Sequence, residues 1–151
     1  MNFVREQITM FIVMFIVGIF LNPMSLMAYK MDDLYISVTL IYGGLIMASN
    51  MMWAHQIVHL LNHGRMNKSI FILGLLLSLF FIFLIRKQIF VSDVEWLKRM
   101  ISHHSTALTS TTKLLENNDF KSNPKLYRLA KDIVYNQNIE ILTMKTFLPR
   151  N

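Results

Sequence analysis

Three apolar stretches fill the first half of the chain, and an amphipathic pattern replaces them in the second half. The apolar stretches cover about residues 8–28, 34–61 and 69–86, with short polar segments between them. A transmembrane helix needs about 17–25 mainly apolar residues, and each stretch reaches that length. A signal peptide also begins with an apolar core, but no small-x-small cleavage pattern follows the first stretch. The pattern therefore predicts a membrane domain over residues 1–88 with three hydrophobic helices.

The second half predicts a polar two-helix domain over residues 92–148. Ser92 and Glu95 match a capping box, in which the serine oxygen accepts from the amide three residues on and the glutamate reaches back. Asn123-Pro124 predicts the start of the second helix, because proline is tolerated in the first turn, where its missing N–H has no helical partner. The turn between the helices is expected near residues 119–121.

Each of these two helices carries a stripe at alternating steps of three and four residues, the spacing that packs two antiparallel helices. The first stripe contains Leu97, Ile101, His104, Leu108, Thr111 and Leu115. The second contains Leu126, Ala130, Ile133, Gln137, Glu140, Met144 and Phe147. Antiparallel pairing places His104 roughly opposite Gln137, and Met100 roughly opposite Glu140 and Met144. The polar members of the two stripes are thus expected to meet.

Two interpretations of this polar cluster follow from its chemistry, because buried polar groups must be hydrogen-bonded or share a cation. In the first, Glu140 accepts a hydrogen bond from a histidine, Gln137 makes another, and the network only sets helix register. In the second, His103 or His104 binds a metal ion with Met100 and Met144, while Glu140 ligates the ion or orients an imidazole. Consecutive helical residues point about 100° apart, so His103 and His104 cannot easily coordinate the same ion.

Composition narrows the class of protein and of ligand. Hydrophobic residues make up 54% of the chain and charged residues 16%, which favours the lipid bilayer as a partner over a soluble state. The chain has 12 methionines and no cysteine, so any soft metal ligand must be methionine or histidine. The net charge is +6, but no basic cluster with interleaved aromatic residues is present, so nucleic-acid binding is not expected.

A second, separate metal candidate lies at the end of the second apolar stretch. Its residues recur every four positions: Met51, His55, His59 and His63. Histidines at positions i and i+4 share a helix face and can chelate a metal. The alternative is a helix end whose histidines reach interfacial water and phosphate. If the third apolar stretch crosses the bilayer, this stripe lies on the opposite side from His103 and His104.

The C-terminal pattern resembles a known family. From Arg86 to Phe147, the motif Met100-Ile101-x-His103-His104 followed by Gln137-x-x-Glu140-Ile141-x-x-Met144 is similar to the domain of unknown function 305 family. The three preceding hydrophobic helices also resemble small bacterial membrane proteins that carry this domain. The resemblance implies a ferritin-like helical fold, copper binding by Met100, His103, His104 and Met144, and support from Glu140 and Gln137. It also implies a cytoplasmic N-terminus and an extracytoplasmic polar domain.

The chain departs from the family pattern at two positions. Ser102 stands where the family usually has proline, and Ser110 stands where many members have another methionine. The missing thioether at position 110 removes one ligand that a methionine-rich copper(I) site would use.

These observations predict an all-α, multi-pass integral membrane protein: three transmembrane helices followed by a C-terminal antiparallel hairpin, a ferritin-like half-bundle. The hairpin is expected to bind a transition metal, with copper favoured and other transition metals open, for buffering, tolerance or handover. Two helices have little core of their own, so self-association into a four-helix bundle is expected. The alternative is a non-enzymatic structural or interaction protein. An acid–base role for His104 and Glu140 ranks last, because no nucleophile, phosphate loop or cofactor motif lies nearby.

Overall fold

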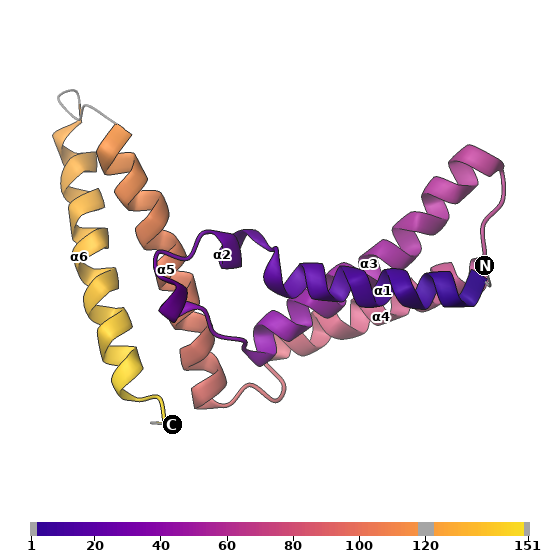
Figure 1. Ribbon diagram of the computed structural model, residues 1–151, viewed down its shortest axis with the longest axis horizontal. Helices are drawn as coiled ribbons and strands as arrows, with labels where there is room; N and C mark the ends of the chain where they lie inside the picture. Colours follow the sequence, from indigo (N-terminus) through magenta and orange to yellow (C-terminus); the bar gives the residue numbers. More distant parts are fainter. Residues whose placement is uncertain (1–2, 118–122, 150–151) are drawn as a thin grey trace. The chain divides into compact units, whose positions relative to one another are not determined.

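The computed structural model describes residues 3–117 and 123–149, and all regular structure in these ranges is helical (Figure 1). The all-α class is therefore confirmed, while the turn expected at residues 119–121 lies outside the described residues. The elements are α1 (Phe3–Phe20), α2 (Pro23–Leu26), the 3-10 helix η1 (Met31–Asp33), α3 (Val38–His63), α4 (Lys68–Lys87), α5 (Asp93–Asn117) and α6 (Pro124–Thr146). They form two compact units, each described by itself below.

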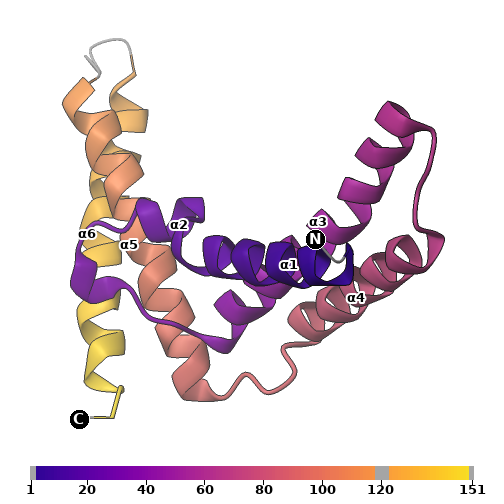
Figure 2. The ribbon, with the colours of Figure 1, turned by 45° about the vertical axis from the view of Figure 1, so that its right-hand side comes forward.

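The first unit comprises the residues up to Asn22 together with Val38–Phe90, and therefore α1, α3 and α4. Helix α3 packs against both α1 and α4. Figures 1 and 2 show α1 and α4 running alongside the first part of α3, whose last turns angle away from both. The loop from Gly64 to Asn67 then returns along these last turns, since His59 Nδ1 of α3 lies 2.8 Å from the Arg65 carbonyl oxygen.

Small residues bring these three helices into close contact. A Cβ added to Gly18 of α1 would lie 2.8 Å from the Cα of Gly44 in α3. A Cβ added to Gly74 of α4 would lie 2.9 Å from both the Met52 Cβ and the Trp53 backbone nitrogen. Ser78, one turn after Gly74, is also buried. Small residues four apart at close helix crossings are typical of helix packing within membranes.

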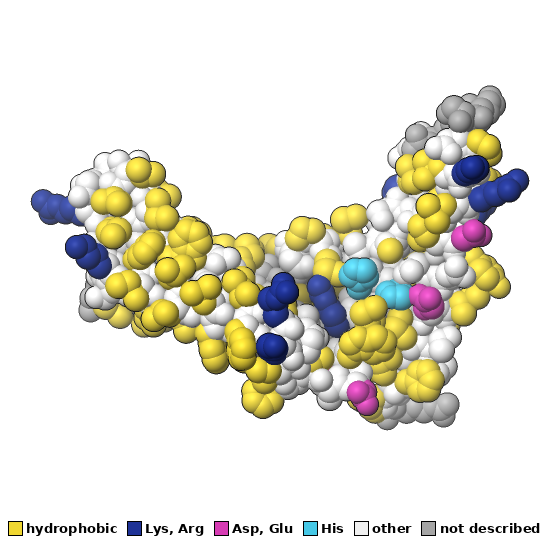
Figure 3. Space-filling model, turned by 180° about the vertical axis from the view of Figure 1, so that it is seen from behind, with side chains coloured by type: hydrophobic (Ala, Val, Ile, Leu, Met, Phe, Trp, Pro, Cys, Tyr) yellow, Lys and Arg dark blue, Asp and Glu magenta, His cyan; other side chains and the backbone are white. Residues whose placement is uncertain are grey.

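Two helical stretches are long and apolar enough to cross a membrane: Val4–Leu26 and Lys68–Lys87. Both leave large apolar side chains exposed along their length, and Figure 3 shows a surface rich in hydrophobic side chains over part of the molecule. The first stretch lies near the N-terminus, where a signal sequence has the same properties. Three spanning helices were expected, and α3 is not among the two. The reason lies in its composition, because α3 carries Ser49, Asn50 and Gln56 among its apolar residues.

The first apolar helix is also shorter than expected. A continuous helix over residues 8–28 was predicted, but α1 ends at Phe20 and the separate α2 begins at Pro23. Proline cannot continue a helix because it lacks the backbone N–H and its ring clashes with the preceding turn. The Asn22 Nδ2 instead donates to the carbonyl oxygens of Gly18 and Ile19, at 3.0 and 2.7 Å, and so satisfies the helix end.

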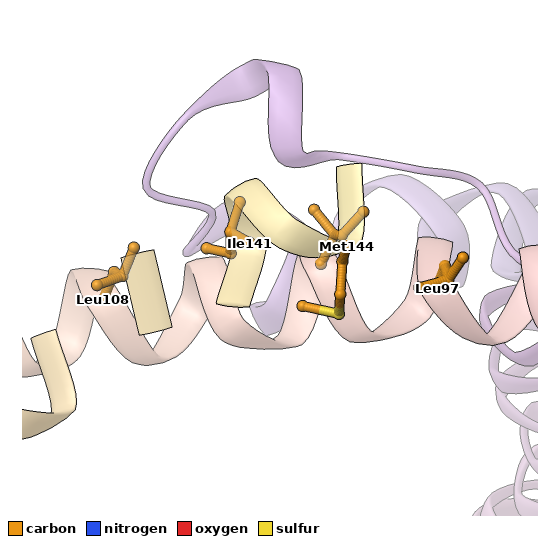
Figure 4. Packing of buried hydrophobic residues seen from close by; sticks show 5 residues of the cluster. Leu97, Leu108, Ile141 and Met144 are labelled. Atoms are coloured by element: carbon orange, nitrogen blue, oxygen red, sulfur yellow. The ribbon is translucent and has the colours of Figure 1, made fainter. Parts of the chain in front are cut away.

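The second unit comprises Pro23–Ser37 and the residues from Val91 onward. Helices α5 and α6 pack together around a core of Leu97, Ile101, Leu108, Ile141 and Met144. In Figure 4 the labelled side chains follow one another along α5 in the order Leu108, Ile141, Met144 and Leu97, so residue numbers rise along one helix as they fall along the other. The antiparallel hairpin is therefore confirmed. The seam of α6 runs through buried Ile141 and not through the expected Glu140, whose side chain is 52% exposed.

Helix α6 also has exposed apolar residues on its surface. Tyr135, Ile139 and Leu142 follow helical spacing and are all exposed. Self-association of the hairpin through such a face stays a prediction, as do membrane insertion of the apolar helices and an extracytoplasmic position of the hairpin.

Candidate functional site

The helix starts that position the site follow the capping signals in the sequence. Ser92 Oγ accepts a hydrogen bond from the Glu95 backbone N–H at 3.4 Å, at the start of α5. Asn123 Oδ1 accepts from the Leu126 backbone N–H at 3.1 Å, and Pro124 occupies the first turn of α6. Side-chain caps of this kind fix where each helix begins, and thereby which residues share a face.

Four of the five predicted metal ligands line one shallow, open pocket between α5 and α6. The pocket has a volume of about 340 Å³ and is lined by Trp96, Met100, His104, Glu140, Thr143 and Met144. Figure 3 shows histidine side chains beside an acidic side chain and a group of hydrophobic side chains. Thioether, imidazole and carboxylate groups thus converge on one concave surface.

His104 and Glu140 form the polar contact at this pocket. The His104 Nδ1 and a Glu140 carboxylate oxygen lie 2.9 Å apart, and the His104 side chain is only 14% exposed. In the described residues no hydrogen bond of good geometry reaches this Nδ1, and the contact becomes an ion pair only when the imidazole is protonated. Burial lowers the pKa of His104, the Glu140 carboxylate opposes that effect, and neighbouring His103 adds to it. The imidazole is therefore held mainly in its neutral form near pH 7, the form that binds metals.

The lowered pKa of His104 predicts how stability depends on pH. Since the folded state gives up this proton more readily than the unfolded state, the unfolded chain binds more protons between the two pKa values. The contribution of His104 to the free energy of unfolding is fully present above about pH 6.5, the ordinary histidine pKa. It is lost as pH falls from there toward the folded pKa, with a slope of at most about 1.4 kcal/mol per pH unit for one proton.

Thermal unfolding of the full-length protein between pH 5 and 8 checks this expectation. The His104→Gln variant should lose the part of the pH dependence that the wild type shows below pH 6.5. The matched variant His103→Gln, at the exposed neighbour, should keep most of it. Identical pH profiles for the wild type and His104→Gln would contradict the assignment.

His103 and Gln137 lie outside the pocket lining. His103 is exposed, and its ring centroid lies 6.0 Å from that of His104. Gln137 has a buried Oε1 for which the described residues provide no donor. Across the described part of the chain, no three His, Cys, Asp or Glu side chains gather closely enough to hold a metal ion. Any ion at this pocket would therefore depend on the methionine sulfurs as well as on His104 and Glu140.

The second histidine stripe forms a ladder of rings along the last turns of α3. The ring centroids of His55 and His59 are 6.4 Å apart, and those of His59 and His63 stack at 4.6 Å. His55 Nδ1 lies 3.4 Å from the amide nitrogen of Gln7 on α1. With its Nδ1 against the Arg65 carbonyl, His59 has only its other ring nitrogen for a further partner.

The comparisons with known proteins bear on the second unit most directly. Residues 86–148 match the family model described as Domain of unknown function (DUF305). These residues form a DUF305 domain. The chain is also 28% identical over 141 residues to an uncharacterized protein of Acanthamoeba polyphaga mimivirus, covering 92% of this chain and 88% of that protein. That viral protein is a distant homologue. No solved structure matches the chain.

A second polar cluster in the same unit was not predicted from the sequence. It joins the DUF305 domain to the segment Pro23–Ser37 around Asp33, which is 2% exposed. The Asp33 carboxylate accepts hydrogen bonds from Ser105 Oγ of α5 at 2.7 Å and from Lys145 Nζ of α6 at 2.5 Å. The Ser105 Oγ in turn accepts from the Tyr29 backbone N–H at 2.8 Å. One carboxylate thus ties the segment to both helices of the hairpin.

Ser102, the departure from the family's usual proline, also takes part in this contact. Its Oγ donates to the Asp33 carbonyl oxygen at 2.8 Å and accepts from the Tyr35 backbone N–H at 3.2 Å. Proline could make neither bond, so serine at position 102 suits the docking of this segment. The signal that could have revealed the docking is Ser102 with Ser105, two small polar residues three apart on a helix face beside the apolar stripe.

Proposed function

We propose that this protein is membrane-anchored through its α1–α3–α4 unit and that its hairpin binds a transition metal ion, with copper favoured. The observation that carries the proposal is the shared pocket of Met100, His104, Glu140 and Met144. The anchor is supported by the two apolar stretches and by the glycine contacts at their crossings with α3. The role would be metal buffering, tolerance or handover.

The chemistry of the pocket fits a soft ion better than a hard one. Met100 and Met144 would supply thioether sulfurs, and His104 would supply an imidazole nitrogen that is buried and without a good hydrogen bond. Soft sulfur ligands favour copper(I), whereas carboxylate and carbonyl oxygens favour magnesium or calcium. Glu140 would ligate the ion or orient the imidazole, and exposed His103 would receive the ion from solution.

The alternative is a structural hairpin in which His104 and Glu140 only fix helix register. It is favoured by Met144, which is 8% exposed and belongs to the hydrophobic core. A methionine that only fills space would be replaceable by leucine without any loss of ligand binding.

Copper content of the purified full-length protein tests the proposal. The wild type, loaded with copper(I) and dialysed, is expected to retain close to one ion per chain. A Met100→Leu/His104→Gln variant loses two proposed ligands and should bind copper more weakly by at least about 10–100-fold, the range found when only an outer-shell partner is lost. The Met51→Leu/His59→Gln variant removes the same residue types from the second metal candidate on α3, and it should retain the wild-type content if the hairpin holds the ion. Equal copper content in the wild type and the Met100/His104 variant would leave the structural hairpin as the better account.

A further inference from the structure

Two pockets lie next to each other in the α1–α3–α4 unit. The polar pocket, of about 330 Å³, is lined by Gln56, His59, Arg65, Met66 and Asn67. The apolar pocket, of about 350 Å³, is lined mainly by apolar side chains of the three helices, among them Ile8, Phe11, Met52, Ile70 and Leu73. On α3, Gln56 follows Met52 by one turn, and Asn67, the N-cap of α4, accepts a hydrogen bond from Ile70 in the first turn of that helix. The two pockets are therefore consecutive along the same pair of helices.

The polar pocket contains a buried donor without an acceptor. Gln56 is 1% exposed, and its Oε1 accepts a hydrogen bond from the Asn67 backbone N–H at 3.1 Å. That bond fixes which end of the amide carries the nitrogen. The Nε2 then has no hydrogen-bond partner within the described ranges. Because an unpaired buried N–H is costly, the arrangement points to an acceptor supplied by a ligand.

The remaining groups at this pocket favour an anionic acceptor. Asn67 caps α4 by accepting from the Ile70 backbone N–H at 3.2 Å, so the pocket lies at the N-terminus of a 20-residue helix. The helix dipole and its free N–H groups attract anions there. Arg65 lines the pocket, Lys68 begins the helix, and the pocket lining contains no Asp or Glu. A phosphate group matches a site with a guanidinium and several N–H donors.

We infer that the α1–α3–α4 unit binds a phospholipid, with the headgroup phosphate in the polar pocket and an acyl chain in the apolar pocket. The neighbouring apolar pocket selects an amphiphile over a free phosphate, since one ligand can fill both pockets only if it has a charged and a hydrocarbon part. The position at the start of a stretch long enough to cross a bilayer agrees with a lipid headgroup. The inference rests on the proposed membrane anchor and is independent of metal binding at the hairpin.

Thermal unfolding of the full-length protein in a neutral detergent tests the inference with three probes. Dioctanoylphosphatidylglycerol is expected to raise the unfolding midpoint by several degrees in a saturable manner. Inorganic phosphate and dioctanoylglycerol, each at the same concentration, should have little effect. An equal shift with inorganic phosphate would overturn lipid binding in favour of a simple anion site. An equal shift with dioctanoylglycerol would overturn the role of the phosphate.

Variants then locate the site. Arg65→Gln, in an exposed loop where folding is not at risk, should raise the half-saturating lipid concentration about tenfold, and Gln56→Leu should do the same. Arg86→Gln removes a basic residue at the opposite end of α4 and should respond as the wild type does. No shift in the wild type, or an unchanged response in Arg65→Gln, would overturn the inference.

Copper content should be equal in the wild type and Arg65→Gln, so failure of lipid binding is distinct from failure of the metal proposal. Recovery of the protein in the soluble fraction without detergent would instead overturn the membrane anchor.

Discussion

Replacing Asp33 by alanine is expected to lower the free energy of unfolding of the second unit by about 3–5 kcal/mol, the usual effect of breaking a buried ion pair. The carboxylate is 2% exposed and accepts from both Ser105 Oγ and Lys145 Nζ. Its removal leaves a partly buried ammonium group and a fully buried hydroxyl without their acceptor. Both groups must then remain unpaired or draw water into the hairpin, and either outcome is unfavourable.

Tryptophan fluorescence of the full-length protein during thermal unfolding measures this effect. The chain has one tryptophan in each unit, Trp53 on α3 and Trp96 on α5, so a Trp53→Phe background reports on the second unit alone. Asp32→Ala is the matched control, because Asp32 is the exposed neighbour on η1. A Lys145→Met change combined with Asp33→Ala should cost less than the sum of the two single changes, since they remove the same contact. Additive effects, or equal losses at Asp32 and Asp33, would contradict the proposed role.

Replacing Gly74 by alanine is expected to destabilise the first unit by about 1–3 kcal/mol, the usual effect of overpacking. The added Cβ would lie 2.9 Å from the backbone nitrogen of Trp53, and backbone cannot move aside as the end of a flexible side chain can. Helices α3 and α4 would have to separate along the crossing. Alanine is the better helix former by about 1 kcal/mol, so a net loss identifies the contact and not the helix propensity as the cause.

Gly43→Ala is the control for this prediction. A Cβ at Gly43 would meet no atom within 4 Å, although the residue is adjacent to the closely packed Gly44. This variant should be neutral or more stable than the wild type, by up to about 1 kcal/mol. Unfolding midpoints of both variants in the same detergent, followed by the fluorescence of Trp53 in a Trp96→Phe background, give the comparison. A Gly74→Ala variant as stable as Gly43→Ala would show that the crossing is looser than described.

Local sequence patterns predicted the helix starts of the hairpin but not the exact face on which its two helices pack. The capping signals at Ser92 and Asn123 depend on residues three positions apart, and both caps form as predicted. The stripes predicted His104 roughly opposite Gln137, and the structure instead places its Nδ1 2.9 Å from the carboxylate of Glu140, which follows Gln137 by about one turn. The seam nevertheless passes through Ile141 instead of Glu140, a rotation of one residue that helical spacing alone does not resolve.

Helix α3 of the first unit shows where the length of an apolar stretch is a poor guide to a membrane span. Helix α3 looked like a spanning helix because its apolar stretch is long, yet its polar residues exclude it from the two candidate spans. Those polar residues are placed inward, with Ser49 and Gln56 fully buried. Which face of α3 meets its neighbours depends on contacts between helices far apart in sequence, so the composition of the stretch cannot reveal it.

By itself the sequence determined the helical class, the two apolar stretches, the caps of the hairpin and the pairing of the two helix stripes that carry His104 and Glu140. Each of these depends on spacing within one helix or between two helices joined by a short turn. Only the tertiary structure decided that Asp33 joins both helices of the hairpin and that His103 lies outside the pocket. It also decided that Gln56 lies buried beside an apolar pocket, with an Nε2 that finds no acceptor among the described residues. These features come from contacts between residues distant along the chain, which no local period encodes.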